Sequence, residues 1–249
     1  MRTLSEKFLR TQMTSHEQTK TPPDADAVIH QLTHPFNRGI GCLLLCVLKI
    51  VKWLKRVSWS TQGIEHIYTH EMPVLFASNH TSHIDTHVIM DVLPQDIRRR
   101  TAVAAAFDHF ADADGKSLYK RVIQALIASV WNAFGIERRK YPLRSIRTMQ
   151  SLIENNWSIV IYPEGTRSRT GDIGRFKPGL AVIAKKTNRP VIPICVKGGL
   201  MVLPEATYIP KHGKISISFG KPLYFDENDT SESFMERVEQ SVQAMYTKS

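Results

Sequence analysis

A chain of 249 residues is long enough to bury a core of its own, as one large α/β domain or two small ones. Its 42% hydrophobic and 22% charged residues are typical of a globular protein and exclude a disordered or fibrous chain. The formal net charge of +10 is unusual and predicts an anionic partner, which could be nucleic acid, an anionic membrane surface or a phosphorylated substrate. Three cysteines are too few for a disulfide framework and indicate a reducing compartment.

The N-terminal segment differs in character from the rest of the chain. Residues 1–35 are mostly polar, contain a Pro-Pro pair and show no sustained hydrophobic period. We therefore expect a mobile arm there. The very start of the chain also lacks the apolar core of a signal peptide.

Residues 36–60 combine an apolar run with charges of one sign. The uncharged stretch Ile40–Leu48 is too short to cross a bilayer, which takes about 20 apolar residues. Lys49, Lys52 and Arg56 would share one helical face among apolar residues that include two tryptophans. The pattern predicts an amphipathic helix in the membrane interface, with anionic lipids as its partner. The alternative is a helix packed on the domain, with its lysines extending outward to solvent.

Residues 61–249 alternate strand-like apolar runs with helical periodicity. This predicts an α/β domain with a mixed, mostly parallel sheet flanked by helices. The expected strands are Pro73–Ser78, Thr101–Phe107, a short one closing at Ile136–Lys140, Trp157–Tyr162, Pro190–Val196 and an edge strand at Lys214–Phe219. The expected helices are Thr86–Leu93, Leu118–Phe134, Leu143–Asn155, a helix opening at Phe176–Gly179 and running to Lys186, and Glu232–Tyr246.

The stretch Asn79–Asp85 falls between an expected strand and an expected helix, a junction where side chains converge at the mouth of an α/β sheet. If Thr81 or Ser82 caps the helix, Asp85 falls in its first turn. Its carboxylate can then reach back to one imidazole nitrogen of His80. That contact would fix the tautomer and leave the other nitrogen free to take a proton from a substrate alcohol.

Two other interpretations of this stretch remain open. The aspartate can simply favour the helix dipole. Alternatively, His80, His83, Asp85 and His87 are possible metal ligands, although no glutamate-bearing zinc signature accompanies them.

A second candidate site follows the strand expected at Trp157–Tyr162. The turn at Pro163–Gly171 offers free backbone amides, and Arg167 and Arg169 add positive charge, so the turn can hold an anion. It is not a P-loop, because its glycines have the wrong spacing and no Lys-Ser/Thr pair follows.

These motifs, in this order, resemble the glycerophospholipid acyltransferase family, which includes the 1-acylglycerol-3-phosphate acyltransferases. The resemblance extends over roughly residues 64–223. The matching blocks are Asn79–Asp85 (Asn-His-x-x-x-x-Asp), Tyr162–Ser168 (with Pro-Glu-Gly-Thr-Arg), Phe176–Gly179 (Phe-Lys-x-Gly) and Val191–Ile194 with its proline. Ile136–Arg138 resembles a further block more loosely, with Glu where Asp is frequent.

The resemblance implies acyl transfer from an acyl thioester, either acyl-CoA or acyl carrier protein, to the free hydroxyl of a lysophospholipid. The expected acceptor is 1-acylglycerol-3-phosphate and the product phosphatidate, with another lyso-lipid as the alternative. His80 would act as the general base and Asp85 would orient it. No metal and no cofactor besides the thioester co-substrate are expected.

The resemblance also implies where the acceptor phosphate is held. Glu164 is an unusual residue beside a phosphate, and we expect it to pair with a neighbouring arginine or with backbone amides. The expected phosphate-binding residues are Glu164, Gly165, Thr166 and Arg167, with Arg138 and Lys177 as further cations.

Such an enzyme is expected on the membrane, as a peripheral or monotopic protein of the cytoplasmic face. The alternative from another class is a non-catalytic module that binds nucleic acid or anionic lipids. Nucleic acid is not expected as a partner, because the aromatic residues do not interleave with the basic ones as a stacking platform would, and no DNA-binding motif occurs.

Overall fold

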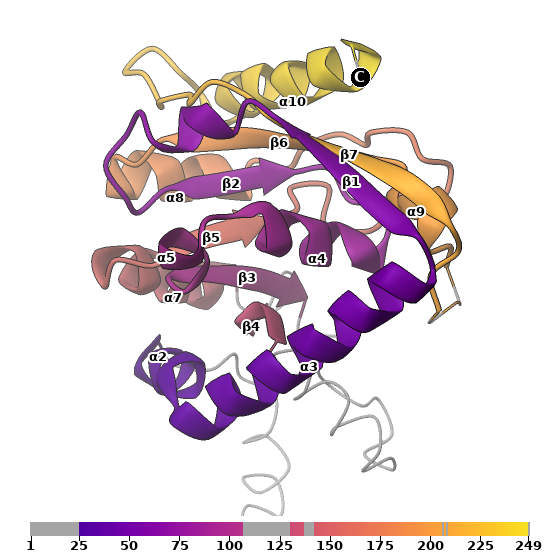
Figure 1. Ribbon diagram of the computed structural model, residues 1–249. Coiled ribbons are helices and arrows are strands. Elements are labelled where there is room, and N and C mark those ends of the chain that lie inside the picture. The colour runs from indigo at the N-terminus through magenta and orange to yellow at the C-terminus, as the bar shows by residue number, and fades with distance from the viewer. Residues whose placement is uncertain (1–24, 107–129, 137–141, 206, 208, 249) are drawn as a thin grey trace, which may run out of the picture.

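The computed structural model describes residues 25–106, 130–136, 142–205, 207 and 209–248. In this part of the chain a seven-stranded sheet carries helices on both faces (Figure 1). The strands are β1 (Val57–Gln62), β2 (Leu75–Ser78), β3 (Thr101–Ala106), β4 (Ala133–Ile136), β5 (Ser158–Ile161), β6 (Val191–Lys197) and β7 (Gly213–Phe219). The helices are α2 (Ala25–Thr33), α3 (Pro35–Leu54), η1 (Ile64–Ile67), α4 (His83–Val92), α5 (Gln95–Arg98), α7 (Pro142–Glu154), α8 (Gly179–Thr187), α9 (Gly199–Val202) and α10 (Ser231–Lys248).

The sheet is mixed and mostly parallel, which confirms the predicted fold class. Its strand order is β1-β7-β6-β2-β5-β3-β4, and every neighbouring pair is parallel except β6 and β7. The central strands β2, β5 and β6 are buried along almost their whole length, as expected of parallel strands covered by helices on both faces.

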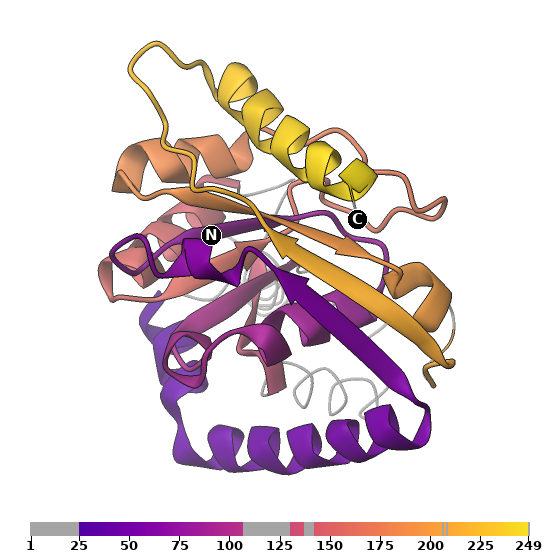
Figure 2. The same ribbon diagram turned by 45° about the horizontal axis from the view of Figure 1, so that its top comes forward.

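Two apolar layers sandwich the sheet. On one face, Trp157, Leu180 and Phe234 belong to the cluster that joins α7, α8 and α10 to the strands. On the other face, Ile89 of α4 and Ile67 of η1 belong to the second cluster. Figure 2 shows α10 and α3 on opposite sides of the molecule. The helices cover the two faces of the sheet. The carboxyl ends of the central strands lie together at one edge, and the candidate site is at this edge.

Strand β1 was not expected, and it changes the place of β7. The sequence predicted a helix up to residue 60 and an edge strand at Lys214–Phe219. Instead, Val57–Gln62 pairs in parallel with Gly213–Ser218, so β7 lies between β1 and β6 and the edge prediction is wrong. The apolar and basic residues of the segment resemble a continuing helix, and the tertiary pairing with β7 overrides that local pattern.

Part of the segment predicted as a mobile arm is helical. Its residues 25–33 form α2, whose Val28 and Leu32 are buried in the cluster with α7, so this part of the prediction is wrong. Two apolar residues at helical spacing are a weak signal in sequence, but they suffice once α7 offers a surface to cover. Residues 1–24 lie outside the described residues.

Helix α3 runs obliquely from α2 to the start of β1 (Figure 1). Its charges are not distributed as predicted. Lys52 points toward the domain, with its Nζ 3.2 Å from the centre of the Trp59 ring and 3.7 Å from Asp91 Oδ2. Arg56 lies beyond the helix in the left-handed region, at φ 50°, so it does not share a helical face with the lysines.

Lys49 is exposed on α3, and so are several large apolar residues. Four large apolar side chains are exposed along its second half: Val47, Ile50, Trp53 and Leu54. Among the described residues, no helix has both the length and the apolar character that crossing a membrane requires.

Some further predictions fall wholly or partly outside the described residues, among them the end of the strand expected at Ile136–Lys140, which is described only to Ile136. The helix expected at Leu118–Phe134 is described only from residue 130, and Phe134 belongs to strand β4 rather than to that helix. Arg138, an expected phosphate ligand, also lies outside the described residues. The other expected strands and helices agree with the structure to within a few residues.

Because α2 packs on the domain, truncating one of its buried side chains should destabilise the protein. Leu32→Ala should lower the free energy of unfolding by about 2–4 kcal/mol, since it removes a side chain that is 4% exposed and leaves a cavity. Urea unfolding of the full chain measures this. Asp26→Ala, at an exposed position of the same helix, should change the free energy by no more than about 0.5 kcal/mol. Equal stability of the two variants would mean that α2 does not pack on the domain.

Candidate active site

The two predicted motifs meet at one edge of the sheet. Strands β2 and β5 are parallel neighbours, so the residues that follow them emerge at the same rim. His80 follows β2 and Glu164 follows β5, and the His80 backbone N–H donates to Glu164 Oε1 at 2.8 Å. The Ser168 N–H in turn donates to the His80 carbonyl oxygen at 2.8 Å. The two motifs therefore share one rim of the sheet.

The local geometry of α4 places Asp85 against His80. Ser82 is the N-cap and Asp85 the third helical residue, and together they form a capping box. Asp85 Oδ2 accepts hydrogen bonds from the Thr81 and Ser82 backbone N–H groups, both at 2.7 Å. The same oxygen lies 3.1 Å from His80 Nδ1. Capping the helix and contacting the histidine are therefore two tasks of one carboxylate, and the two interpretations of this aspartate do not compete.

The contact sets the chemistry of the imidazole. A carboxylate accepts only, so Nδ1 carries the proton and, in the neutral ring, Nε2 holds a free lone pair. The His80 side chain is 15% exposed whereas that of Asp85 is fully buried. The ring is therefore accessible from outside while the group that orients it is not. This arrangement suits a base that takes a proton from a bound hydroxyl.

Tyr162 supports the ring from its flat side. It is the residue that follows β5, and its ring is stacked on His80 with centroids 3.9 Å apart and planes 18° apart. Its hydroxyl is 2.7 Å from Thr86 Oγ1. Burial raises the pKa of the Tyr162 phenol, so the ring remains neutral. Sequence reasoning missed both residues, although the position of Tyr162 directly before the Pro-Glu-Gly-Thr-Arg motif was a usable signal.

Asn79, the first residue of its motif, has a structural task. Its side-chain amide exchanges two hydrogen bonds with the backbone of Val196, donating at 2.9 Å and accepting at 2.8 Å. These bonds extend the β2–β6 ladder by one step past the end of β2. The last motif, Val191–Ile194, lies within β6 itself and supports the rim without reaching the site.

Glu164 holds the two loops together. Besides the His80 amide, it accepts from the Gly174 N–H at 3.0 Å. Burial raises the pKa of the Glu164 carboxyl, and these two backbone hydrogen bonds oppose that shift. The expectation that Glu164 pairs with backbone amides is confirmed, and the structure shows no ion pair between it and a described arginine.

Arg167 and Arg169 instead converge on Glu205, a residue that sequence reasoning missed. Arg167 Nη2 lies 3.9 Å from Glu205 Oε1, and Arg169 Nε lies 3.3 Å from Glu205 Oε2. Glu205 comes from the loop after α9, far away in sequence. A carboxylate therefore sits where two guanidinium groups meet, which is the charge pattern that a phosphate would also satisfy.

The other expected phosphate ligands surround this turn. Gly165 adopts φ 74°, a left-handed conformation that suits glycine and sharpens the turn after Glu164. Thr166 is exposed at its tip. The Lys177 backbone N–H donates to the Pro163 carbonyl at 3.0 Å, which attaches that segment to the same turn, and its side chain is exposed.

The metal interpretation finds little geometric support. Within the described ranges, no three His, Cys, Asp or Glu side chains are grouped as a metal site requires. His87 is 7% exposed and faces Trp59, with ring centroids 5.6 Å apart. Burial lowers the pKa of its imidazole, which therefore stays neutral.

Gly199 closes the site behind Asp85. A Cβ atom built on this glycine would overlap Asp85 Oδ1, and it would lie 3.3 Å from Thr81 Oγ1. Asp85 Oδ1 has no hydrogen-bond partner among the described residues, so nothing but packing holds that side of the carboxylate. The absence of a side chain at Gly199 is thus a condition for the His80–Asp85 contact.

The rim of this α/β sheet presents a candidate general base beside a turn suited to an anion. A family model described as Acyltransferase matches residues 59–197, more than half of the chain's 249 residues, and the chain belongs to this family. The matched region contains every described site residue named so far except Gly199 and Glu205.

Several relatives carry a more specific name. The 1-acyl-sn-glycerol-3-phosphate acyltransferase BAT2, chloroplastic, of Brassica napus is 27% identical over 68% of this chain and 46% of its own length. The human 1-acyl-sn-glycerol-3-phosphate acyltransferase beta is 25% identical over 63% of this chain and 57% of its own length. The chain thus spans about half the length of the relatives it matches.

A solved structure shows the same fold. It is the 1-acyl-sn-glycerophosphate (LPA) acyltransferase, PlsC, from Thermotoga maritima, with a TM-score of 0.62 and 20% sequence identity. The match covers 85% of this chain and 78% of that one.

The close approach of Gly199 to Asp85 predicts a loss of acyl transfer in Gly199→Ala. The added methyl must push the carboxylate away from His80, and we expect the transfer rate to fall by about tenfold or more. In an Asp85→Ala background the same change should cost nothing further, because the overlapping oxygen is gone. Rate measurements on the four proteins of this double-mutant cycle test the coupling.

Gly213→Ala is the matched control for this cycle. Its Cβ would lie 2.7 Å from Val202 Cγ2, so it disturbs α9 without touching Asp85. If Gly213→Ala and Gly199→Ala slow transfer by the same factor, displacement of α9 is the cause and the steric role of Gly199 is wrong.

Proposed function

We propose that the protein transfers a fatty acyl group from acyl-CoA or acyl carrier protein to the free hydroxyl of 1-acylglycerol-3-phosphate, forming phosphatidate. The observation that carries this proposal is the His80–Asp85 contact at 3.1 Å, placed on the same rim as the Arg167 turn. The names of the relatives support the choice of acceptor.

The proposed reaction needs no nucleophile from the protein. His80 Nε2 accepts the proton of the acceptor hydroxyl while its oxygen attacks the thioester carbonyl carbon. The new C–O bond forms, the C–S bond breaks, and the proton held by His80 passes to the departing thiolate. Asp85 keeps the ring in the required tautomer and stabilises the imidazolium that forms between these steps.

The acceptor phosphate would bind at the turn after β5. Arg167 can offer two parallel N–H donors to phosphate oxygens, and the backbone at Gly165 and Thr166 adds donors. Backbone amides donate to both oxygens of Glu164, which offsets part of its repulsion toward the phosphate. Lys177 and Arg138 would add positive charge around the turn.

The acceptor and product are membrane lipids, so the protein would work at a membrane surface. We propose that α3 lies in the interface on its exposed apolar residues Val47, Ile50, Trp53 and Leu54. The basic balance of the chain favours an anionic surface, and its few cysteines favour the cytoplasmic face. The sheet domain, whose first strand is β1 at Val57–Gln62, would lie above that surface.

The role of His80 predicts that His80→Ala lowers turnover by about 10²–10⁴-fold while the fold remains intact. Turnover is followed by release of free thiol from palmitoyl or oleoyl thioesters with lysophosphatidate as the acceptor. His83→Ala is the control, because His83 is exposed in the same motif and belongs only to the metal interpretation.

Three results would contradict this assignment. They are near-normal turnover in folded His80→Ala, equal losses in the two variants, or inhibition by EDTA that zinc reverses. The last two would favour the metal interpretation.

Substitutions at Arg167 and at its partner Glu205 should change the acceptor's KM in opposite directions. Arg167→Lys keeps the charge but loses the planar fork, so the acceptor's KM should rise by about tenfold while the thioester's KM stays nearly constant. Glu205→Gln removes the carboxylate that competes for Arg167 and should lower the acceptor's KM about two- to fivefold, as fits a half-exposed pair.

Steady-state kinetics with each substrate varied in turn measures both effects. If Arg167→Lys raises both KM values alike and lowers the melting temperature, Arg167 only stiffens the turn and the phosphate role is wrong.

A further inference from the structure

A basic hollow lies between the end of α3 and the start of β7. Its volume is about 550 Å³, and its lining brings together cations from two distant parts of the sequence. We define the basic hollow by its cations Lys55, Arg56, Lys211 and His212 and by the apolar residues Leu54 and Ile209. None of the four basic side chains forms an ion pair with a described residue, so their charge is available to a ligand.

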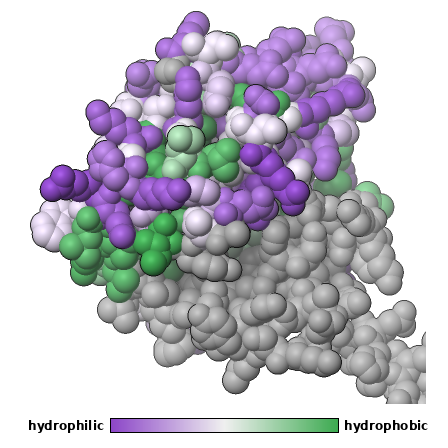
Figure 3. Space-filling view, turned by 90° about the vertical axis from the view of Figure 1, so that its right-hand side faces the viewer, coloured by the Kyte–Doolittle hydropathy of each residue, from purple (hydrophilic) through white to green (hydrophobic). Residues whose placement is uncertain are grey.

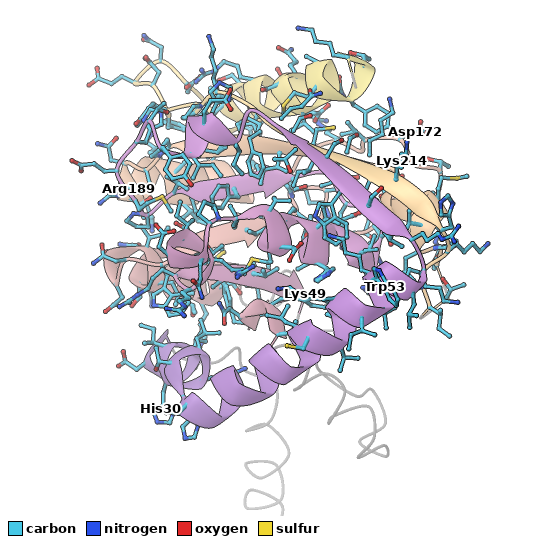
Figure 4. The ribbon with its side chains drawn as sticks, viewed as in Figure 1. His30, Lys49, Trp53, Asp172, Arg189 and Lys214 are labelled. Carbon is cyan, nitrogen blue, oxygen red and sulfur yellow. The ribbon has the colours of Figure 1, made fainter. Side chains whose placement is uncertain are left out.

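The hollow lies at the same end of the sheet as the candidate active site. Strand β6 ends at Lys197, opposite Ser216 of β7, so the earlier residues of β7 project beyond the rim that β2, β5 and β6 share. Gly213, at the start of β7, pairs with Val57, which follows the hollow's Arg56. Figure 4 labels Trp53 and Lys214 at this same end of the molecule.

Exposed apolar side chains border the hollow. Leu54 and Ile209 in its lining are 63% and 64% exposed. Trp53, which precedes Leu54, and Met201 of α9 are 77% and 78% exposed. Figure 3, which faces this end, shows apolar side chains gathered in a patch next to strongly hydrophilic ones. Large apolar residues this exposed are costly in water and indicate a surface that is covered during function.

We propose that the basic hollow binds the phosphate of an anionic phospholipid headgroup, with Trp53, Leu54 and Ile209 inserted beside it among the lipid chains. The cations complement the charge of the phosphate, and the exposed apolar residues insert among the lipid chains. The proposal rests on the proposed membrane function and adds a second attachment point to α3.

The apolar border favours a lipid over a soluble phosphate. The nucleotide part of coenzyme A or free glycerol phosphate would use the cations but would leave Trp53, Leu54 and Ile209 in water. A lipid surface uses both sets of residues at once.

The second attachment point has a consequence for orientation. A single interfacial helix leaves the domain free to tilt about the helix axis. A headgroup held at the start of β7 removes that freedom and turns the rim that carries His80 toward the membrane, where the acceptor is found.

The test is binding of the full chain to vesicles of phosphatidylcholine with and without phosphatidylglycerol, measured by flotation. Lys55→Glu combined with Lys211→Glu should weaken binding to the anionic vesicles by at least tenfold, since each basic residue near such a surface contributes roughly fivefold. Binding to neutral vesicles should change less than threefold.

A charge-matched control removes the effect of net charge. Lys186→Glu combined with Lys221→Glu makes the same change at two exposed lysines away from the hollow, and should weaken binding to anionic vesicles by less than threefold. Melting curves of both double variants establish that each is folded. Equal losses in the two double variants would overturn the proposal, since only the overall charge would then matter.

Two further arms separate this inference from the proposed function. Val47→Ser combined with Ile50→Ser, at exposed α3 residues outside the hollow, should reduce binding to both kinds of vesicle. If this variant alone loses binding while the Lys55/Lys211 variant binds as wild type does, membrane attachment by α3 stands and the basic hollow is not a lipid site. If the Lys55/Lys211 variant binds vesicles normally but raises the KM of acyl-CoA, the hollow serves the soluble donor, and the lipid assignment is overturned.

Discussion

The site depends on one oxygen atom, Asp85 Oδ2. It accepts from two backbone amides at the start of α4 and contacts the imidazole of His80. The same hydrogen bonds that begin the helix also aim the carboxylate, so α4 would lose its capping box with Asp85 in another position. The geometry of the candidate base is thereby built into secondary structure rather than held by a flexible loop. Gly199 leaves room for Asp85 Oδ1, and the Tyr162 ring stacks on the flat side of the His80 imidazole. In the proposed reaction, the imidazolium would lie between a carboxylate and an aromatic face, both of which favour positive charge.

Sequence alone could predict the parts of this site that are close together along the chain. Spacing placed His80 before a helix and Asp85 in its first turn, and the capping box makes that relation obligatory. The strands that carry the motifs were also predictable, because buried parallel strands are continuous apolar runs. The meeting of His80 and Glu164 follows from the general rule that carboxyl ends of parallel strands share a rim, whereas the strand order depends on pairings between distant segments and was not predicted.

The errors have a common physical origin, since each concerns a contact between segments far apart in sequence. Strand β1 exists because β7 pairs with it, and α2 is ordered because α7 covers its two apolar residues. Glu205 faces Arg167 only after α9 has folded back along the sheet. Lys52 turns inward because Asp91 and Trp59 lie beneath it, which no periodicity along α3 could reveal. The apolar outer face of α3 is therefore more distinct in the structure than the basic face that its sequence suggested.

The pairing of β1 with β7 has a consequence for the order in which the protein is completed. In the described sheet β1 is an edge strand, and β7 is its sole neighbour. The chain is synthesised from the N-terminus, so β1 leaves the ribosome long before any partner for it exists. The long loop that this pairing closes makes it one of the slow contacts of the fold. If α3 binds lipid as proposed, it could do so during translation, whereas the surface formed jointly with the start of β7 arises only after nearly the whole chain has emerged. In the proposed membrane binding, attachment by α3 and orientation by the basic hollow would therefore be separate events.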